Sequence, residues 1–128
     1  MCAEVSLIHP GKVCRSASQD HCFKSAFGTE TLYPGHRYYF ELRCVKGTNF
    51  KFGIATAAAM NDPDQAFSDT EGGFAYFSMG SLRHASKGQG PSYGEKFKQD
   101  DVIGVYVDLA EGVLFFSKNG TAYTKNAF

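Results

Sequence analysis

The side chains best suited to catalysis are three aspartates close together near the carboxyl-terminal end of the sequence. Asp100 and Asp101 precede an apolar segment, and Asp108 ends it. Paired carboxylates serve as general acid and general base in many hydrolases. Aspartates beside turns also accept hydrogen bonds from nearby backbone N–H groups, which is a purely structural role. Because no nucleophile with an identifiable base accompanies them, we favour turn capping for all three.

Other patterns that would indicate catalysis or metal binding are weak. Cys14, His21 and Cys22 do not have a standard zinc spacing. An acidic cluster lacks the central glycine and spacing of a helix-loop-helix calcium site; it comprises Asp62, Asp64, Asp69 and Glu71. The sequence contains no GxSxG motif, phosphate-binding loop or dinucleotide fingerprint. We therefore expect no enzymatic activity, no metal and no cofactor.

Composition narrows the class of protein further. The 128 residues fit one domain, and 13 basic against 13 acidic residues create no overall attraction to nucleic acid or anionic membrane. No apolar run is long enough to span a bilayer, so we expect no membrane insertion. The first twelve residues do not resemble a secretory signal. The four cysteines are accordingly expected to be reduced thiols in a cytoplasmic or nuclear protein.

Strand signals are frequent and helical periodicity is almost absent. Apolar and polar residues alternate in residues 36–45 and 50–56, and strands are also expected at 73–78, 102–109 and 113–118. Asn119-Gly120 is a strong two-residue hairpin signal. The segment 55–67 is interrupted by Pro63 and should hold at most one short turn. These signals predict an all-β, antiparallel β-sandwich.

One glycine inside a predicted strand has a structural meaning of its own. Gly104 lies within the segment 102–109. A missing side chain in the middle of a strand indicates close packing against a neighbouring backbone or aromatic ring. We therefore expect a larger residue at this position to overpack the sheet.

Several segments together resemble the SPRY domain family. They are YYFELR (38–43), FKFGIA (50–55), GGFAY (72–76), YGEKFKQDDVIGVYVDL (93–109) and LFFSKNG (114–120). The last two are most similar to the SPRY inserts of a DEAD-box RNA helicase and a nuclear scaffold ribonucleoprotein, and the order of elements is also similar to Ran-binding scaffold proteins. The resemblance implies a bent, concanavalin-like jelly-roll sandwich at residues 13–128, preceded by an extension at 1–12.

Two departures from the family pattern affect this expectation. Many members of the family carry a tryptophan after the segment that corresponds to FKFGIA (50–55). This sequence lacks it and has Ala55 or Thr56 near that position. The sequence also ends at Phe128, where the family usually continues with one or two strands, so the final strands are expected to be missing. Either the domain is truncated, or a dimer or a partner strand covers an open carboxyl-terminal edge by strand complementation.

Charge is distributed unevenly over two loop-rich segments. Residues 55–72 carry four acids and no Lys or Arg, whereas the ionisable side chains of residues 80–98 are mainly basic. Loops on a rigid sandwich often provide binding specificity. We expect them to form a partner-binding surface; its candidate residues are Phe67, Met79, Leu82, Arg83, His84, Lys87 and Tyr93. The alternative is ordinary loop charge in contact with solvent.

Two functional classes remain. The first is a non-catalytic protein-interaction module that recognises a peptide or surface loop, as an adaptor such as those of ubiquitin ligases or as a subunit of a multiprotein complex. The second is an RNA-associated module, which the resemblance to the helicase and ribonucleoprotein inserts implies. The neutral net charge counts against direct RNA binding.

Overall fold

The structure is a computed structural model, and it describes residues 5–8, 13–16, 23–61 and 65–128. Their elements, in order, are β1 (Val5–Ile8), β2 (Val13–Ser16), β3 (Arg37–Arg43), β4 (Lys51–Ala55), η1 (Ala57–Asn61), η2 (Phe67–Asp69), β5 (Gly73–Phe77), β6 (Ser81–His84), β7 (Val102–Asp108), β8 (Val113–Lys118) and β9 (Thr121–Ala122). Both η elements are short 3-10 helices.

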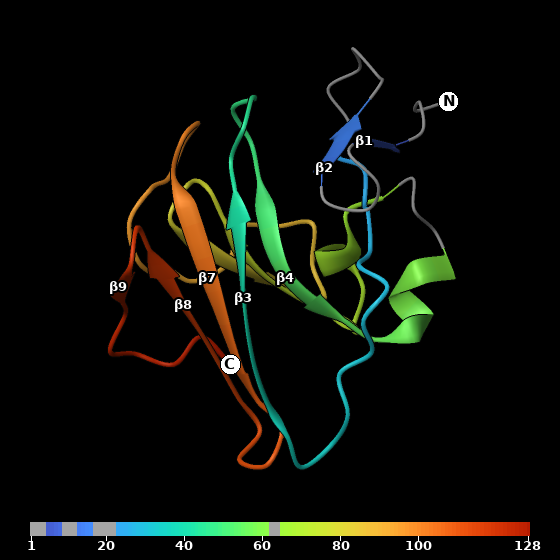
Figure 1. Ribbon diagram of the computed structural model, residues 1–128, viewed down its shortest axis with the longest axis vertical. Coiled ribbons are helices and arrows are strands. Elements are labelled where there is room, and N and C mark those ends of the chain that lie inside the picture. The colour runs from blue at the N-terminus through green and yellow to red at the C-terminus, as the bar shows by residue number, and fades with distance from the viewer. Residues whose placement is uncertain (1–4, 9–12, 17–22, 62–64) are drawn as a thin grey trace.

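The strands form two main antiparallel sheets (Figure 1). One has the order β3-β7-β8-β9 and the other the order β4-β5-β6, while β1 and β2 pair with each other. The predicted all-β antiparallel sandwich is thus confirmed. None of the described helices is long and apolar enough to cross a membrane.

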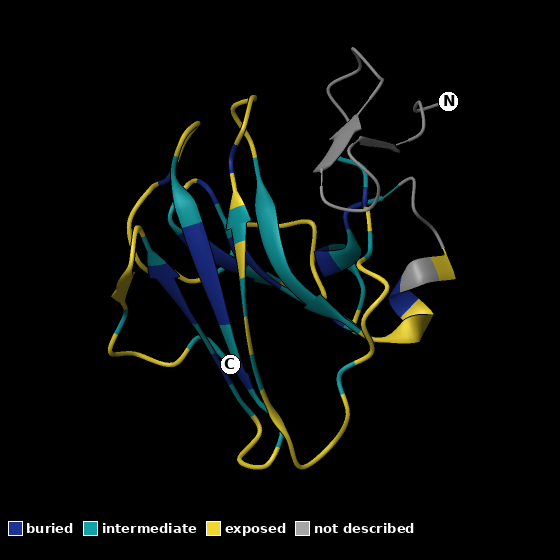
Figure 2. Cartoon of the chain, in the orientation of Figure 1, coloured by how far each residue is buried: buried dark blue, intermediate teal, exposed yellow. Residues whose placement is uncertain are grey.

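Alternation along the strands determines which side chains lie between the two sheets. In β3, Tyr38, Phe40 and Leu42 pack against the core, as the sequence predicts. The adjacent strand β7 contributes Ile103 and Val105, both 0% exposed. The buried positions gather along β7 and β8 and on the facing strands of the second sheet (Figure 2). Apolar burial on this scale is the main stabilising term of the fold.

The hairpin between β8 and β9 follows the predicted turn. Asn119 and Gly120 both have positive φ, 50° and 86°, as a type I′ turn requires. The Asn119 side chain accepts a hydrogen bond from the Val102 amide at 2.9 Å and so links the turn to the start of β7.

The end of the chain runs along β8. The Tyr123 amide donates a hydrogen bond to the Phe116 carbonyl at 3.0 Å, and the Leu114 amide donates one to the Phe128 carbonyl at 2.9 Å. A further bond joins the Ala127 amide to the Leu114 carbonyl at 2.8 Å. The edge of β8 is therefore paired by residues 121–128 of the same chain.

Some elements differ from the sequence expectations. The segment 55–67 was expected to hold at most one short turn, but η1 and the start of η2 both lie in it. β6 was not predicted, because Ser81–His84 is short and mostly polar; β5 and the segment 90–93 hold it on its two sides. β1 lies within the expected extension and pairs with β2, so the limits of the domain stay a prediction.

Candidate functional site

Asp101 and Asp108 cap turns at opposite ends of β7. Asp101 accepts hydrogen bonds from the Lys98 amide at 2.8 Å and the Asn119 side chain at 2.9 Å. The Asn119 bond is the largest of the interactions that lower the pKa of Asp101. Asp108 accepts bonds from the amides of Glu111 and Ala110, which lower its pKa in the same way. The predicted turn capping is confirmed for both, and a carboxyl held ionised in this way is a poor general acid.

The third aspartate has a different environment. Asp100 has a left-handed backbone, with φ of 75°, and its carboxylate lies 3.7 Å from the Arg43 guanidinium. Both side chains are well exposed, so this ion pair stabilises the fold little. No hydrogen bond from a local backbone amide to the Asp100 side chain is present among the described residues, so its predicted capping role is not seen.

Three of the predicted binding residues lie close together in sequence at the end of β6, but the structure does not place them on one face. Arg83 points to the outer face of the β4-β5-β6 sheet, whereas the next residue, His84, points to the opposite face, against Phe74. We call Arg83 and the exposed Lys87 that follows β6 the basic hairpin surface. Arg83 lies over the Phe77 ring, 4.9 Å from its centre, and donates a hydrogen bond to the Gly88 carbonyl at 2.6 Å. An aromatic ring beneath a guanidinium and a carbonyl beside it restrict its motion. The Arg83 side chain is thus positioned before any partner binds.

His84 is exposed but ordered by its neighbours. Its ring stacks on Phe74 with 4.2 Å between centres, and Phe128 contacts it edge-on at 5.9 Å. Its Nδ1 lies 2.9 Å from the Gly73 carbonyl oxygen. Because a carbonyl only accepts, Nδ1 carries the proton and donates it. Nε2 is therefore the ring nitrogen directed to other partners.

A second cation lies on the same outer face of the β4-β5-β6 sheet. The Lys51 side chain is only 9% exposed; its ammonium is 4.0 Å from the centre of the Phe23 ring and 3.6 Å from an Asp69 oxygen. This separation makes an ion pair without a hydrogen bond. Burial lowers the pKa of Lys51, Asp69 opposes the shift, and Arg83 adds to it. The face is therefore cationic, with one carboxylate compensating in part.

The other predicted binding residues lie elsewhere. Met79 is 51% exposed and occupies the turn between β5 and β6, at the opposite end of that hairpin from His84. Phe67 is half-buried, with its ring 6.2 Å from that of Phe27. Leu82 and Tyr93 belong to the core, at 6% and 4% exposure. The structure thus does not bring the seven residues together in one pocket.

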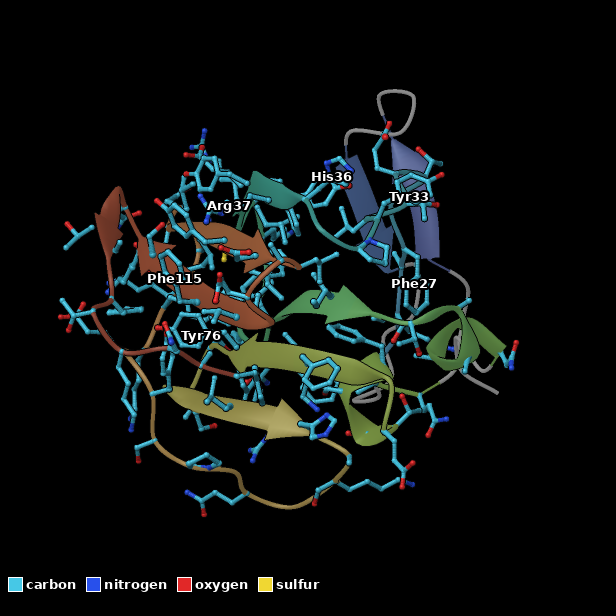
Figure 3. The ribbon with its side chains drawn as sticks, turned by 90° about the horizontal axis from the view of Figure 1, so that it is seen from below. Phe27, Tyr33, His36, Arg37, Tyr76 and Phe115 are labelled. Carbon is cyan, nitrogen blue, oxygen red and sulfur yellow. The ribbon has the colours of Figure 1, made fainter. Side chains whose placement is uncertain are left out.

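Tyr93 contributes to a shallow depression of about 280 Å³ between residues 92–94 and 123–125. The Tyr93 hydroxyl donates to the Lys125 carbonyl at 3.0 Å and accepts from the Phe116 amide at 3.2 Å. Tyr76, which points into the space between the sheets (Figure 3), contacts the Tyr93 ring edge-on at 5.5 Å. Tyr93 therefore holds the end of the chain against the core.

Residues relevant to metal binding are only partly described. Among the described parts of the chain, no three His, Cys, Asp or Glu side chains gather closely enough to hold an ion. Cys2, Cys22, His9 and His21 lie outside them, as do Asp62 and Asp64 of the acidic segment. Cys44 is fully buried, and this burial raises the pKa of its thiol to about 11.

One group of residues was missed by reasoning from sequence. Tyr39, Tyr106 and Phe115 occupy adjacent strands in one row, with centres 4.5 Å apart at each step. The row lies on the outer face of the β3-β7-β8-β9 sheet, and Tyr39 is 50% exposed. Alternation placed Tyr39 outside the core, but only the strand register reveals the row. We call these three residues the aromatic row.

Comparison with known proteins gives one consistent result. The family model described as SPRY domain matches residues 37–128. The chain is 32% identical over 84 residues to the ATP-dependent RNA helicase DDX1 of Xenopus laevis, covering 66% of this chain and 10% of the helicase. It is equally similar to a Ran-binding proteins 9/10 homolog of Drosophila melanogaster, over 65% of this chain and 9% of that protein.

The Ran-binding protein 9 of Mus musculus is likewise 32% identical, over 65% of this chain and 13% of its own length. The matched region thus spans about a tenth of each of these relatives. Similarity to an RNA helicase and to Ran-binding proteins agrees with the resemblance seen in the sequence.

Proposed function

Because this chain belongs to the SPRY domain family, whose members are generally non-catalytic protein-interaction modules, we propose that it recognises a short peptide or a surface loop of a partner protein. The chain would act as an adaptor or as a subunit of a larger assembly, in the cytoplasm or nucleus. Relatives named as Ran-binding proteins support such a scaffold role.

The position of Arg83 is the main support for a binding site on the basic hairpin surface. Phe77 lies beneath its guanidinium and the Gly88 carbonyl lies beside it, so little side-chain entropy remains to be lost on binding. Arginine forms two parallel hydrogen bonds with carboxylates and is common in binding hot spots. The exposed Lys87, four residues further along the chain, adds a positively charged donor. The preferred partner is therefore an acidic segment.

RNA association is the second candidate, supported by the relative named as an RNA helicase. The geometry of the aromatic row argues against stacking of nucleotide bases there. Tyr106 and Phe115 stack face to face with only 5° between their planes. Each of these two rings therefore covers one face of the other, and the Tyr39 ring lies beside Tyr106 at 4.5 Å. Fewer ring faces are left for the stacking by which single-stranded nucleic acid binds.

A peptide selection tests the proposal. A random peptide library displayed on phage would be selected on the immobilised chain, and the affinity of enriched peptides measured by fluorescence anisotropy. We expect enrichment of peptides with Asp or Glu, and a loss of affinity of about tenfold or more with Arg83→Ala, as for a hot-spot residue. Lys46→Ala, on the exposed loop between β3 and β4, is the matched control and should bind normally.

Two results would count against this site. One is enrichment of peptides without acidic residues, and the other is equal affinity for Arg83→Ala and the parent chain. The RNA alternative is tested in parallel with a labelled single-stranded oligonucleotide. Binding that weakens steeply with salt would favour RNA.

A further inference from the structure

The aromatic row lies on the outer face of the β3-β7-β8-β9 sheet, on the side away from the β4-β5-β6 sheet (Figure 1). Its members come from three adjacent strands, and the register places them directly beside one another, Tyr39 next to Tyr106 and Tyr106 next to Phe115. Tyr39 is 50% exposed, while Tyr106 and Phe115 are partly exposed. Solvent-exposed aromatic clusters rimmed by charge are typical of protein interfaces.

Opposite charges lie on the two sides of this row. In β3, Arg37 lies two residues before Tyr39 and Glu41 lies two residues after it, so all three share the outer face. Figure 3 shows Arg37 on the side of the β3-β7 sheet that faces away from Tyr76. Arg37 is well exposed, and Glu41 accepts a hydrogen bond from the Tyr39 hydroxyl at 2.5 Å. The charge sequence along the strand is therefore positive, aromatic, negative.

We propose that this face binds a second copy of the chain, face to face, about a two-fold axis. The axis would run between the two facing sheets, perpendicular to the strands and parallel to the aromatic row. Such an axis places β3 opposite β3 of the other copy, and the two strands run in opposite directions. Each aromatic row then meets its own copy, and the Arg37 of either chain lies opposite the Glu41 of the other.

The rest of the face agrees with this arrangement. The same axis places Asp108, which is paired with Arg37 of its own chain, opposite Gly104 of the other copy, so that the other copy's Glu41 faces Arg37 directly and Asp108 lies one strand away. It also places Val113 opposite Ser117. A self-complementary patch of this kind is what a two-fold interface requires. The net charge of zero adds no long-range repulsion between copies.

The size of the face sets the expected strength. Three strands spaced about 4.8 Å apart and seven residues of about 3.3 Å each give a face of roughly 15 by 23 Å. The area of such a face, about 350 Å², is smaller than the roughly 800 Å² that each partner buries in a standard interface. We therefore expect a reversible dimer that depends on protein concentration and weakens in high salt.

Charge reversal with mixing tests the proposal. Sedimentation velocity would follow the 128-residue chain from about 10 µM to about 1 mM, where an equilibrium of micromolar to millimolar strength is visible. Arg37→Glu and Glu41→Arg should each raise the dissociation constant about tenfold or more, because like charges then face each other. An equal mixture of the two variants should dimerise again, since the two substituted chains then present unlike charges to each other.

The controls separate this interface from a contact elsewhere on the chain and from a loss of folding. Lys87→Glu introduces an acidic residue on an exposed loop beyond β6 and should leave the dimer intact. Thermal unfolding checks each variant, because Arg37→Glu also loses the ion pair with Asp108. Glu41→Arg disturbs no ion pair seen in the described residues, but it removes the acceptor of the Tyr39 hydroxyl. Glu41→Gln keeps an acceptor and loses only the charge, so it should also weaken the dimer, and it carries the test if Arg37→Glu folds poorly.

Three results would overturn the proposal. The first is a parent chain that stays monomeric over the whole range. The second is a dimer that persists in Glu41→Arg, which would place the contact elsewhere, for example at the edge of residues 121–128. The third is a mixture of the two variants that does not dimerise although each is folded.

Discussion

Replacing Gly104 by alanine should destabilise the domain, although a glycine inside a strand ordinarily gains stability from such a change. Gly104 lies within β7, facing Ser117 of β8 and Glu41 of β3. A Cβ added there would lie 2.2 Å from the Ser117 Oγ and 3.0 Å from the Tyr39 ring. The sequence predicted this close approach, and the structure confirms it.

Two effects oppose each other at this position. Alanine restricts the unfolded chain more than glycine does, which stabilises the fold by about 0.4–1 kcal/mol. Overpacking costs about 1–3 kcal/mol, and Ser117 is only 1% exposed, so its hydroxyl has little space to move into. We expect a net loss of about 1 kcal/mol, which lowers the melting temperature by roughly 3–5 °C for a domain of this size.

Urea denaturation of four proteins would measure the effect: the parent chain, Gly104→Ala, Ser117→Ala and the double variant. With the Ser117 hydroxyl removed, the same glycine substitution should be nearly neutral. Gly28→Ala is the matched control, because its added Cβ has no atom within 4 Å and its φ is not positive. If Gly104→Ala were as stable as Gly28→Ala in both backgrounds, the pairing of β7 with β8 would be wrong.

Three further predictions concern groups held by hydrogen bonds or by burial. Tyr93→Phe leaves the Phe116 amide without its hydroxyl partner, so the free energy of unfolding should fall by about 1–3 kcal/mol in urea denaturation with an unchanged m value; equal stability would show that the bond is not formed. Folding lowers the pKa of Asp101, so its carboxylate stabilises the folded state fully at pH values above its unfolded pKa of about 3.9. This stabilisation is lost as the pH falls through the folded pKa. Asp101→Asn should therefore flatten the fall in melting temperature below about pH 5. An unchanged profile would show that Asp101 contributes nothing to the acid sensitivity of the fold. The thiol of Cys44, with a pKa of about 11, should resist iodoacetamide at about pH 8 until the domain unfolds, as peptide mapping would reveal; rapid labelling of the folded chain would contradict its burial.

Much of the fold could be predicted because the strands on the core side carry strong local patterns. Alternation in residues 36–45 identified the inward face of β3 correctly, and Asn119-Gly120 identified the β8–β9 turn. Local signals were insufficient for β6, whose four residues become a strand because neighbouring segments bond to both of its edges. Such an element depends on tertiary pairing and has no pattern of its own.

Candidate binding residues were harder to predict than the core, because composition does not reveal the direction of a side chain. Leu82 and Arg83 are adjacent in the basic segment, yet alternation along β6 sends the first into the core and the second outward over Phe77. Once β6 is known to be a strand, a period of two is enough to separate them. Loop charge was therefore a useful guide to the region but not to the individual side chains.

The aromatic row could not be predicted from local patterns either; here the missing information was the register of the strands. Its residues are 67 and 9 positions apart in sequence, and only the antiparallel register of three strands places them side by side. A register slip by one residue would turn every side chain of a strand to the other face. The row and the Gly104 contact therefore depend on the same pairing of β3, β7 and β8. A neutral Gly104→Ala in both Ser117 backgrounds would remove the geometric basis for the face-to-face dimer, whereas a destabilised one would leave the charge-reversal experiment to decide whether a second copy binds there.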